Sequence, residues 1–402
     1  MNKIELLAPA GDLARAKIAI MYGADAVYLG GKSFSLRSRA SNFDLTDIAE
    51  AVSFAKEYQA RIYVTVNIIP HDEDLDGLED YLSALAACGV SAIICSSLYI
   101  AKVSKLVAPK MEVHLSTQQS VTNSAAIAYY HKMGINRIVL ARELSMTEIE
   151  LTNKNSLLPL EVFIHGGMCA NYSGRCTISN FMTYRDANRG GCAHSCRWFY
   201  HLFNNDEMID KDDELFTMAA RDLSAAAYIS RLIEMNVASL KIEGRMKSAY
   251  YIAAVIKTYR LLIDEYYQKN TITPDRLAWY QKELNKSENR LASDGYLNGI
   301  PIEDPISALV KSTAAQAFVG YVKDYRDGMA LIEVRNRFIK GDRLEILSPT
   351  CDNRQFNVET IIDEENNMID ICNKPMQLLW IAIPYPVNEH DMLRRGDDDV
   401  SV

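Results

Sequence analysis

A chain of 402 residues in which 49% are apolar and 24% are charged has an ordinary globular composition, which excludes extensive disorder. The length exceeds that of a usual domain, so we expect one large domain and one smaller one. A formal net charge of −9 excludes nucleic-acid binding through the whole surface, so any RNA contact must use a local basic patch.

The first part of the chain alternates short apolar runs with amphipathic stretches. We expect strands at residues 4–9, 25–31, 61–69, 91–97, 111–117, 136–142, 160–167 and 239–245. Between most of them, apolar residues recur every three or four positions, as in helices that pack on a sheet; examples are residues 13–23, 45–59 and 77–89. Strict alternation predicts a parallel sheet, and eight repeats favour a closed (β/α)8 barrel of TIM type over an open doubly wound sheet.

The alternation stops after the seventh strand, where a long insertion replaces the usual helix. This insertion leaves the barrel at the carboxyl end of a strand, the face on which barrel enzymes build their active sites, so we expect it to be functional. Past the barrel, we expect strands at residues 317–336 (with a hairpin turn at Asp327-Gly328), 341–347, 356–362 and 378–384. The predicted domains are a barrel over 1–268 with its insertion at 165–205, a helical and polar connector over 269–305, a small β domain over 306–393 and a flexible tail over 394–402.

The cellular compartment decides whether the cysteines are expected to form disulfides or to stay reduced. The N-terminal residues lack the continuous apolar region of a secretory signal, and no run approaches the roughly 20 apolar residues that cross a bilayer. We therefore expect a cytoplasmic protein with no membrane contact, in which thiols stay reduced and structural disulfides are disfavoured. Clustered cysteines in such a protein indicate metal or redox chemistry.

Four cysteines lie close together in the insertion with the spacing C-x6-C-x15-C-x3-C: Cys169, Cys176, Cys192 and Cys196. We predict that they hold a metal centre. Structural zinc sites bring ligands in pairs two to four residues apart, which only the last two cysteines approach, and four thiolates suit an iron–sulfur cluster equally well. His165, His194 and His201 are alternative ligands, although each is more typical of an ordinary polar contact.

Polar residues at the carboxyl ends of the barrel strands should converge on one cavity, and most of them are cationic. Such a concentration favours an anionic ligand, because arginine forks bind carboxylates and phosphates in a bidentate manner. The alternative is that they form ion pairs that fix the barrel loops. The predicted substrate-binding residues are Arg37, Arg39, Asn67, Gln118, Arg142, Glu243, Arg245 and Lys247, with Lys32, Glu143 and Lys241 at equivalent strand ends.

The insertion is a local exception in an acidic chain, because arginines and aromatic residues alternate there with few acidic ones. Unstacked RNA bases and their phosphates need that combination, for stacking and charge neutralisation together. The alternative is that the aromatic rings pack over the metal site. The predicted RNA-binding residues are Arg175, Arg185, Arg189, Arg197, Tyr172 and Trp198.

One segment resembles the signature of peptidase family U32, the collagenase-like proteases: EVFIHGGMCANYSGRCTIS at residues 161–179. The resemblance extends over essentially the whole chain, through LLAPAG (6–11), DAVYLGG (25–31), SLKIEGRMKSAYYIAAVIKTYR (239–260) and FVGYVKDY (318–325). It implies a (β/α) barrel and a four-iron four-sulfur (4Fe-4S) cluster bound by four cysteines, which favours iron over zinc. In some members the fourth ligand lies further downstream, where this chain has Leu232, so Cys196 takes the fourth place here.

The resemblance also implies a function. Several family members act in oxygen-independent hydroxylation. Some hydroxylate the wobble uridine of tRNA with prephenate as hydroxyl donor, one hydroxylates a cytidine of 23S rRNA, and a pair serves ubiquinone synthesis. Length and the C-terminal β domain are most similar to the tRNA group, which implies an iron–sulfur enzyme that forms 5-hydroxyuridine in tRNA and holds prephenate with barrel arginines. Alternatives are an rRNA substrate, a true peptidase that acts on protein, and a metal-stabilised RNA-binding protein without catalysis. A second protein of the same family is a candidate partner.

Overall fold

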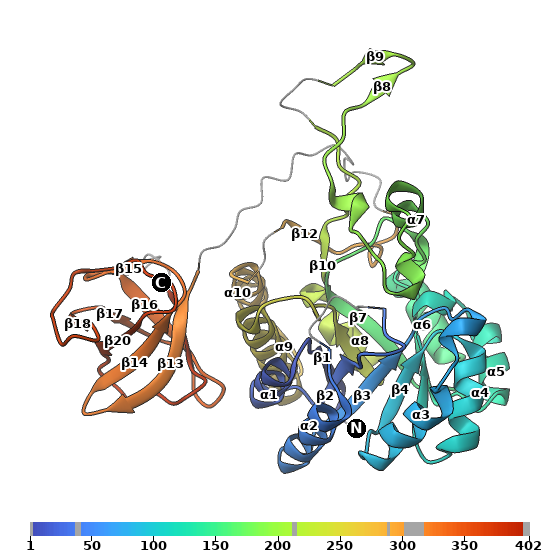
Figure 1. The fold of residues 1–402 in the computed structure, drawn as a ribbon, viewed down its shortest axis with the longest axis horizontal. Coiled ribbons are helices and arrows are strands. Elements are labelled where there is room, and N and C mark those ends of the chain that lie inside the picture. Colours follow the sequence, from blue (N-terminus) through green and yellow to red (C-terminus); the bar gives the residue numbers. More distant parts are fainter. Residues whose placement is uncertain (1–2, 37–41, 211–214, 288–289, 301–316, 397–402) are drawn as a thin grey trace.

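A closed ring of parallel strands forms the centre of the larger domain (Figure 1). The computed structural model describes residues 3–36, 42–210, 215–287, 290–300 and 317–396. The barrel strands are β1 (Glu5–Pro9), β2 (Ala26–Gly30), β3 (Arg61–Val66), β4 (Ala92–Cys95), β5 (Glu112–Leu115), β6 (Arg137–Val139), β7 (Leu160–Gly166) and β11 (Ser239–Ile242). Each pairs with the next, and β11 pairs with both β1 and β7, which closes the sheet. The predicted (β/α)8 barrel is therefore confirmed, and every strand lies inside its expected range.

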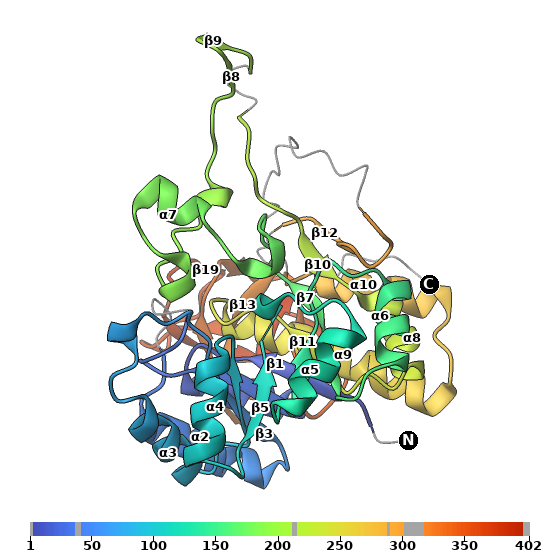
Figure 2. The ribbon, with the colours of Figure 1, turned by 90° about the vertical axis from the view of Figure 1, so that its right-hand side faces the viewer.

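Helices cover the outside of the barrel (Figures 1 and 2). They are α1 (Leu13–Met21), α2 (Leu45–Glu57), α3 (Leu78–Ala87), α4 (Leu98–Val107), α5 (Ser124–Lys132), α6 (Met146–Lys154), α8 (Ile229–Glu234) and α9 (Ala249–Lys269), with 3-10 turns at Asp72–Asp74, Thr117–Gln119 and Ala226–Tyr228. Side-chain caps set where helices begin; Ser248, for example, accepts a hydrogen bond from the N–H of Tyr251 at the start of α9. Among the helices in the described ranges, none is long and apolar enough to cross a membrane.

Side chains inside the barrel form an apolar layer and, next to it, a charged one. The apolar layer is a separate cluster made of Leu7, Ala26, Tyr28, Tyr63, Ala92 and Ile94. The charged layer, which we name the charged column, consists of Glu5, Arg61, Arg137, Glu161 and Lys241. Barrel interiors are ordinarily filled by branched apolar side chains, so this column is a departure from the usual core.

The insertion lies over the carboxyl ends of the barrel strands (Figures 1 and 2). It contains α7 (Ile178–Thr183), 3-10 turns at Tyr172–Gly174, Ala187–Arg189 and Ser195–Arg197, and the hairpin of β8 (Phe203–Asn204) and β9 (Glu207–Met208). The hairpin projects furthest from the barrel (Figure 1). The chain returns through β10 (Asp222–Ser224), which pairs antiparallel with β7 and parallel with β12 (Ala292–Ser293).

The C-terminal domain is an antiparallel sheet with a core of its own. Its strands are β13 (Phe318–Arg326), β14 (Met329–Val334), β15 (Phe338–Ile339), β16 (Arg343–Leu347), β17 (Arg354–Asn357), β18 (Ile361–Ile362), β19 (Ile371–Cys372), β20 (Leu378–Ala382) and β21 (Met392–Arg395). The hairpin turn at Asp327-Gly328 is confirmed by the β13–β14 pairing. The single strand expected at 356–362 is wrong, because β17 pairs with β16 whereas β18 pairs with β20. The boundary at 306 lies outside the described residues, and the strand β21 includes Arg394 and Arg395 of the predicted tail.

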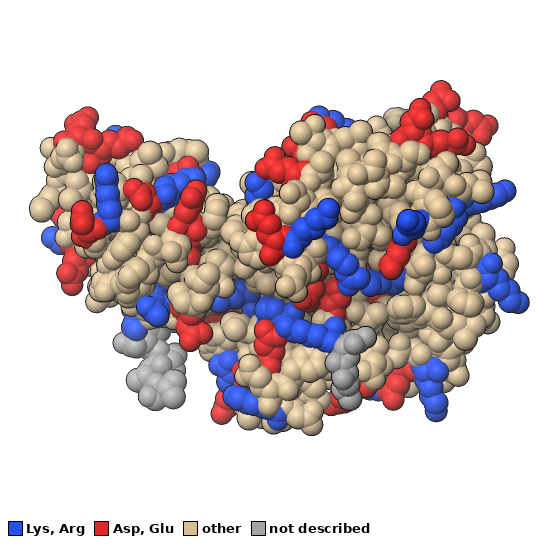
Figure 3. All heavy atoms as spheres, turned by 90° about the horizontal axis from the view of Figure 1, so that it is seen from below, with Lys and Arg blue, Asp and Glu red and all other residues tan. Residues whose placement is uncertain are grey.

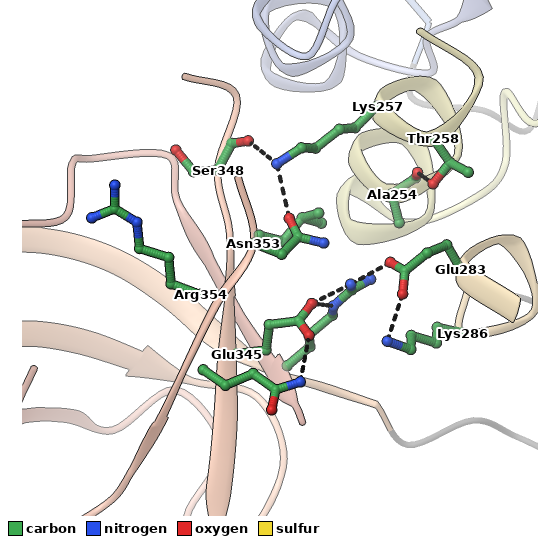
Figure 4. Close-up of polar contacts among 12 residues, drawn as sticks. Ala254, Lys257, Thr258, Glu283, Lys286, Glu345, Ser348, Asn353 and Arg354 are labelled. Carbon is green, nitrogen blue, oxygen red and sulfur yellow. Dashed lines mark hydrogen bonds and ion pairs between the residues drawn. The ribbon is translucent and has the colours of Figure 1, made fainter. Parts of the chain in front are cut away.

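Polar side chains join the two domains at a seam between α9, α10 (Pro274–Asn285) and the C-terminal sheet (Figure 4). Lys257 of α9 donates to the carbonyl oxygens of Ser348 and Cys351 and to Oδ1 of Asn353, at 2.7–2.8 Å. Seen from the side opposite the insertion, the molecule has two lobes on which acidic and basic side chains are interspersed (Figure 3). The seam therefore fixes the C-terminal domain beside the barrel helices rather than over the carboxyl ends of the strands.

Candidate functional site

A cavity of about 170 Å³ lies at the carboxyl ends of the barrel strands, beneath the insertion. Side chains that follow β3, β5, β6, β7 and β11 line one side of it, and the insertion lines the other. Many of the predicted site residues meet there: Asn67, Gln118, Arg142, Glu243, Arg245, Arg197 and the cysteines Cys169, Cys176, Cys192 and Cys196. The strand ends and the insertion therefore form one site, as their positions in the sequence predicted.

All four clustered thiols face this cavity, the first of them exposed and the others half-buried. The side chain of Asn188 holds the loop that carries Cys176. It accepts a hydrogen bond from the backbone N–H of Cys176 at 3.2 Å and donates one to the carbonyl oxygen of Cys176 at 2.9 Å. Burial raises the pKa of the Cys196 thiol, and the nearby Cys169 raises it further, whereas Arg197 opposes the shift. A bound cation would relieve this disfavoured thiolate, since metal centres take cysteine as thiolate.

Four cysteine side chains at one cavity have the donor chemistry of a metal centre. In the part of the chain that the structure describes, no three Cys, His, Asp or Glu side chains form a group that could hold one metal ion. Four soft thiolates suit zinc or an iron–sulfur cluster. Of the alternative ligands, His194 lines the cavity, whereas His165 is buried against Tyr259 and burial lowers its pKa to about 3. Among the described residues, His201 pairs with Asp210 and is outside the cavity lining.

Arg245 is a firmly held cation of the cavity. Its side chain is buried, and its guanidinium donates to the hydroxyls of Ser35 and Thr65 at 2.9 and 3.1 Å and to Oδ1 of Asn42 at 2.9 Å. Gly30 makes room for it, because a Cβ at that position would lie 1.9 Å from Nη2 of the arginine. These hydroxyl and amide partners fix the orientation of the guanidinium at the cavity, where a cation can attract an anion.

Two further arginines line the cavity, Arg142 after β6 and Arg197 from the insertion. Arg142 donates to the carbonyl oxygen of Gly167 at 2.8 Å, and its guanidinium lies 4.9 Å from the ring centroid of Phe163. Nη2 of Arg197 also lies close to Gly167, 3.0 Å from where a Cβ would be placed on that glycine. Lys247 is outside the cavity lining; its ammonium is 3.4 Å from Asp222 and lies over the ring of Tyr251, so its role in substrate binding stays a prediction.

The predicted RNA-binding residues have different surroundings. Tyr172 and Trp198 are exposed, as is Arg175, and Arg185 is half-buried. Arg189 forms ion pairs with Asp74 and Glu73, at 2.6–2.8 Å, which fasten the insertion to the loop after β3. Their roles in RNA binding stay predictions. The predicted residues Arg37 and Arg39 lie outside the described residues.

Two contributions to the site were not among the predicted site residues. Asn188 positions a cysteine loop, and Ser35 and Thr65 position Arg245. Lys241, which was expected at a strand end beside the cavity, does line it. Asn188 had no signal in the sequence, because a side chain that holds a loop by its backbone has no characteristic spacing.

The protein combines a (β/α)8 barrel, a cysteine-bearing insertion over the carboxyl ends of the strands, and a C-terminal β domain. Comparison with known proteins identifies the family that has this combination. Residues 11–305 match the model of peptidase family U32, and residues 314–394 match the model of the family's C-terminal domain. The chain belongs to peptidase family U32.

Several curated relatives are similar to this chain over long stretches. The "tRNA hydroxylation protein P1" of Bacillus subtilis is 43% identical over 98% of this chain and 95% of its own length. The "23S rRNA 5-hydroxycytidine C2501 synthase" of Escherichia coli is 39% identical over 65% of this chain but only 40% of its own length. The "Collagenase" of Porphyromonas gingivalis is 29% identical over 99% of both chains.

Proposed function

We propose that this protein is an RNA-hydroxylating enzyme that forms 5-hydroxyuridine at the wobble position of tRNA, with a 4Fe-4S cluster in the insertion and prephenate as hydroxyl donor. The observation that carries the proposal is the cavity in which four thiols and several cations face one another beneath the insertion. The nearly full-length similarity to a tRNA hydroxylation protein supports tRNA as the substrate, ahead of the rRNA on which a more distantly matched relative acts.

Four thiol donors on one cavity support a metal centre in the insertion. Cys169, Cys176, Cys192 and Cys196 all line that cavity. Four thiolates are the ligand set of a 4Fe-4S cluster. Cys169, Cys176, Cys192 and Cys196 would hold it, and it would supply one-electron chemistry beside the reacting base.

The other wall of the cavity supports an anionic co-substrate such as prephenate, which has two carboxylates. Hydroxyl groups of Ser35 and Thr65 orient Arg245, and Arg142 and Arg197 line the same cavity, so carboxylates there would meet several charge-assisted donors. The RNA would approach over the exposed rings of Tyr172 and Trp198, which can stack on unpaired bases.

The experiment that tests this function is mass spectrometry of tRNA from cells with and without the gene. In its absence, wobble uridines of a subset of tRNAs should be lighter by one oxygen atom, and the wild-type gene should restore them. We would abandon the proposal if tRNA and rRNA modification were the same in both strains. If cluster-loaded protein also cleaved gelatin catalytically, the peptidase function that the collagenase relative favours would replace it.

A second prediction concerns Arg245 and needs no change to that residue. In a Gly30→Ala variant the new methyl group would occupy the place of Nη2, so the guanidinium must leave its three hydrogen-bond partners. Loss of one charged hydrogen-bonding group costs about 1.5–3 kcal/mol, so prephenate affinity measured by calorimetry should fall roughly ten- to hundredfold. Gly77→Ala is the control for backbone strain away from the cavity, because Gly77 has a φ of +74° and no atom of the described residues lies within 4 Å of an added Cβ. Equal affinity in both variants would show that Arg245 does not bind the anion.

A further inference from the structure

The charged column passes through the barrel interior and reaches the floor of the cavity. At its start, Glu5 forms an ion pair with Arg61, whose side chain is half-exposed. Glu5 also forms an ion pair with Arg137, whose Nη1 lies 2.5 Å from Oε1 of the glutamate. Arg137 is also 3.3 Å from Glu161, and Glu161 accepts from Lys241 at 2.7 Å. Lys241 lines the cavity. Charges thus follow one another from the amino-terminal mouth of the barrel to the active-site side.

Lys241 is held so that its ammonium faces several partners at once. The residue is 4% exposed, and Nζ lies 4.5 Å from the ring centroid of Tyr28 and 5.3 Å from that of Phe163, both of which also line the cavity. Among the described residues, Nζ of Lys241 donates to Oε1 of Glu161 at 2.7 Å. An ammonium has three N–H donors, so this lysine retains donors for a ligand.

Glu161 is shared between two cations, so it neutralises neither of them completely. Burial opposes its ionisation, but Lys241 and Arg137 together hold its pKa below the ordinary value, and the carboxylate stays charged. Replacing such a buried ion network by apolar residues of similar size is often neutral or stabilising. The charged column is therefore poorly explained by stability alone, and its end at the cavity points to function.

The neighbouring side chains also present donors. Asn67 lines the cavity, and its Oδ1 accepts from the backbone N–H of Leu36 at 3.2 Å. Because a backbone N–H can only donate, this contact fixes the amide orientation and leaves the NH2 group of Asn67 for a ligand. Arg245 adds a third kind of donor to the same space. A ligand made of acceptors, such as a carboxylate, matches this lining.

We propose that Lys241 is a further substrate-binding residue, which donates from the cavity floor to a carboxylate of the small anionic co-substrate. Glu161, Arg137 and Glu5 are positioning residues that hold the ammonium in place. This inference rests on the proposed function, since it assumes that the cavity takes a carboxylate co-substrate. It assigns to the barrel interior a part of the site that the strand-end arginines do not provide.

The test is calorimetry of cluster-loaded protein with prephenate as the probe. Lys241→Met should weaken binding roughly ten- to hundredfold, while iron content and tRNA binding stay at the wild-type level. Lys257→Met is the matched control, because Lys257 is also a buried lysine with hydrogen-bond partners but lies at the domain seam. That control should lower the melting temperature and leave prephenate affinity unchanged.

A double variant, Lys241→Met with Glu161→Met, guards against simple misfolding, since it removes the ion pair as a unit and keeps the barrel filled. Wild-type affinity in either folded Lys241 variant would overturn the inference. If wild-type protein binds no prephenate, both this inference and the co-substrate proposal fail, whereas the RNA substrate is still decided by the wobble-uridine mass. If the wild-type gene restores that mass and the Lys241→Met gene restores it equally well, only the inference fails.

Discussion

Replacing Arg394 by Met is expected to lower the free energy of unfolding by about 3–5 kcal/mol, the usual cost of breaking a buried ion pair from one side. Arg394 is 1% exposed, and its guanidinium contacts Glu283 of α10 and Glu345 of β16, with Nε 2.8 Å from the second carboxylate. Without the cation, two buried carboxylates from different domains would face each other. The seam shown in Figure 4 should then open before either domain core does.

The pH dependence of this loss has a definite sign. Burial alone would raise the pKa of Glu283, but Arg394 and Lys286 hold it below the ordinary value. A carboxylate with a depressed folded pKa contributes stability that is present above its unfolded pKa and is lost as the pH falls through the folded value. The difference between the variant and the wild type should therefore be largest near neutral pH and shrink below about pH 4.

Denaturant unfolding at pH 7 and pH 4 measures both effects. Arg395→Met is the matched control. The side chain of this neighbouring arginine is 43% exposed, and its ion pair with Asp342 is long, at 3.4 Å. An exposed pair contributes about 0–1 kcal/mol, so the control should unfold close to the wild type. Equal stability of the two variants would mean that the buried network does not hold the domains together.

Replacing Cys176 by Ala is expected to remove the proposed cluster completely and, with it, hydroxylation of tRNA. Anaerobically purified wild-type protein should be brown and contain iron, because four thiolates complete the coordination of such a cluster. The variant should lose both the iron and the visible absorbance, and its gene should not restore the missing oxygen atom in the deletion strain. Thermal unfolding should show that the barrel is still folded, since the thiol is only half-buried and makes no contribution to the barrel core.

Cys88→Ala is the control, because this cysteine is also half-buried but lies at the end of α3, outside the cavity. It should keep full iron content. Stoichiometric iron in the Cys176 variant would contradict the ligand assignment, and zinc in place of iron in both proteins would contradict the cluster itself.

The barrel could be predicted because each of its strands is an apolar run and all but the seventh are followed by a helix-compatible stretch, a pattern that depends on local sequence alone. The pairs of β10 with β7 and β12 could not be predicted in this way. They are two or three residues long and carry no periodicity, and only the folded insertion brings them together. The split of residues 356–362 into two strands was missed for a related reason, since both halves are apolar enough but pair with different neighbours.

The site shows the same division between local and distant signals. The thiols are close in sequence, so their convergence on one cavity was predictable, as was that of side chains at the ends of parallel strands. The charged column was not found, because Glu5 and Arg61 each begin a strand and therefore look like solvent-exposed boundary residues. Their inward direction follows only from the closure of the barrel.

The attachment of the insertion gives the cysteine loops a mechanical connection to a distant part of the chain. The side chain of Asn188 accepts a hydrogen bond from the backbone N–H of Cys176, and its backbone carbonyl oxygen accepts one from the N–H of Ile69. The adjacent Arg189 forms an ion pair with Asp74. The loop after β3 thus serves as the anchorage for one of the thiols. A change of shape in that loop would be transmitted to the spacing of the thiols, so the two segments should tolerate substitution only in concert.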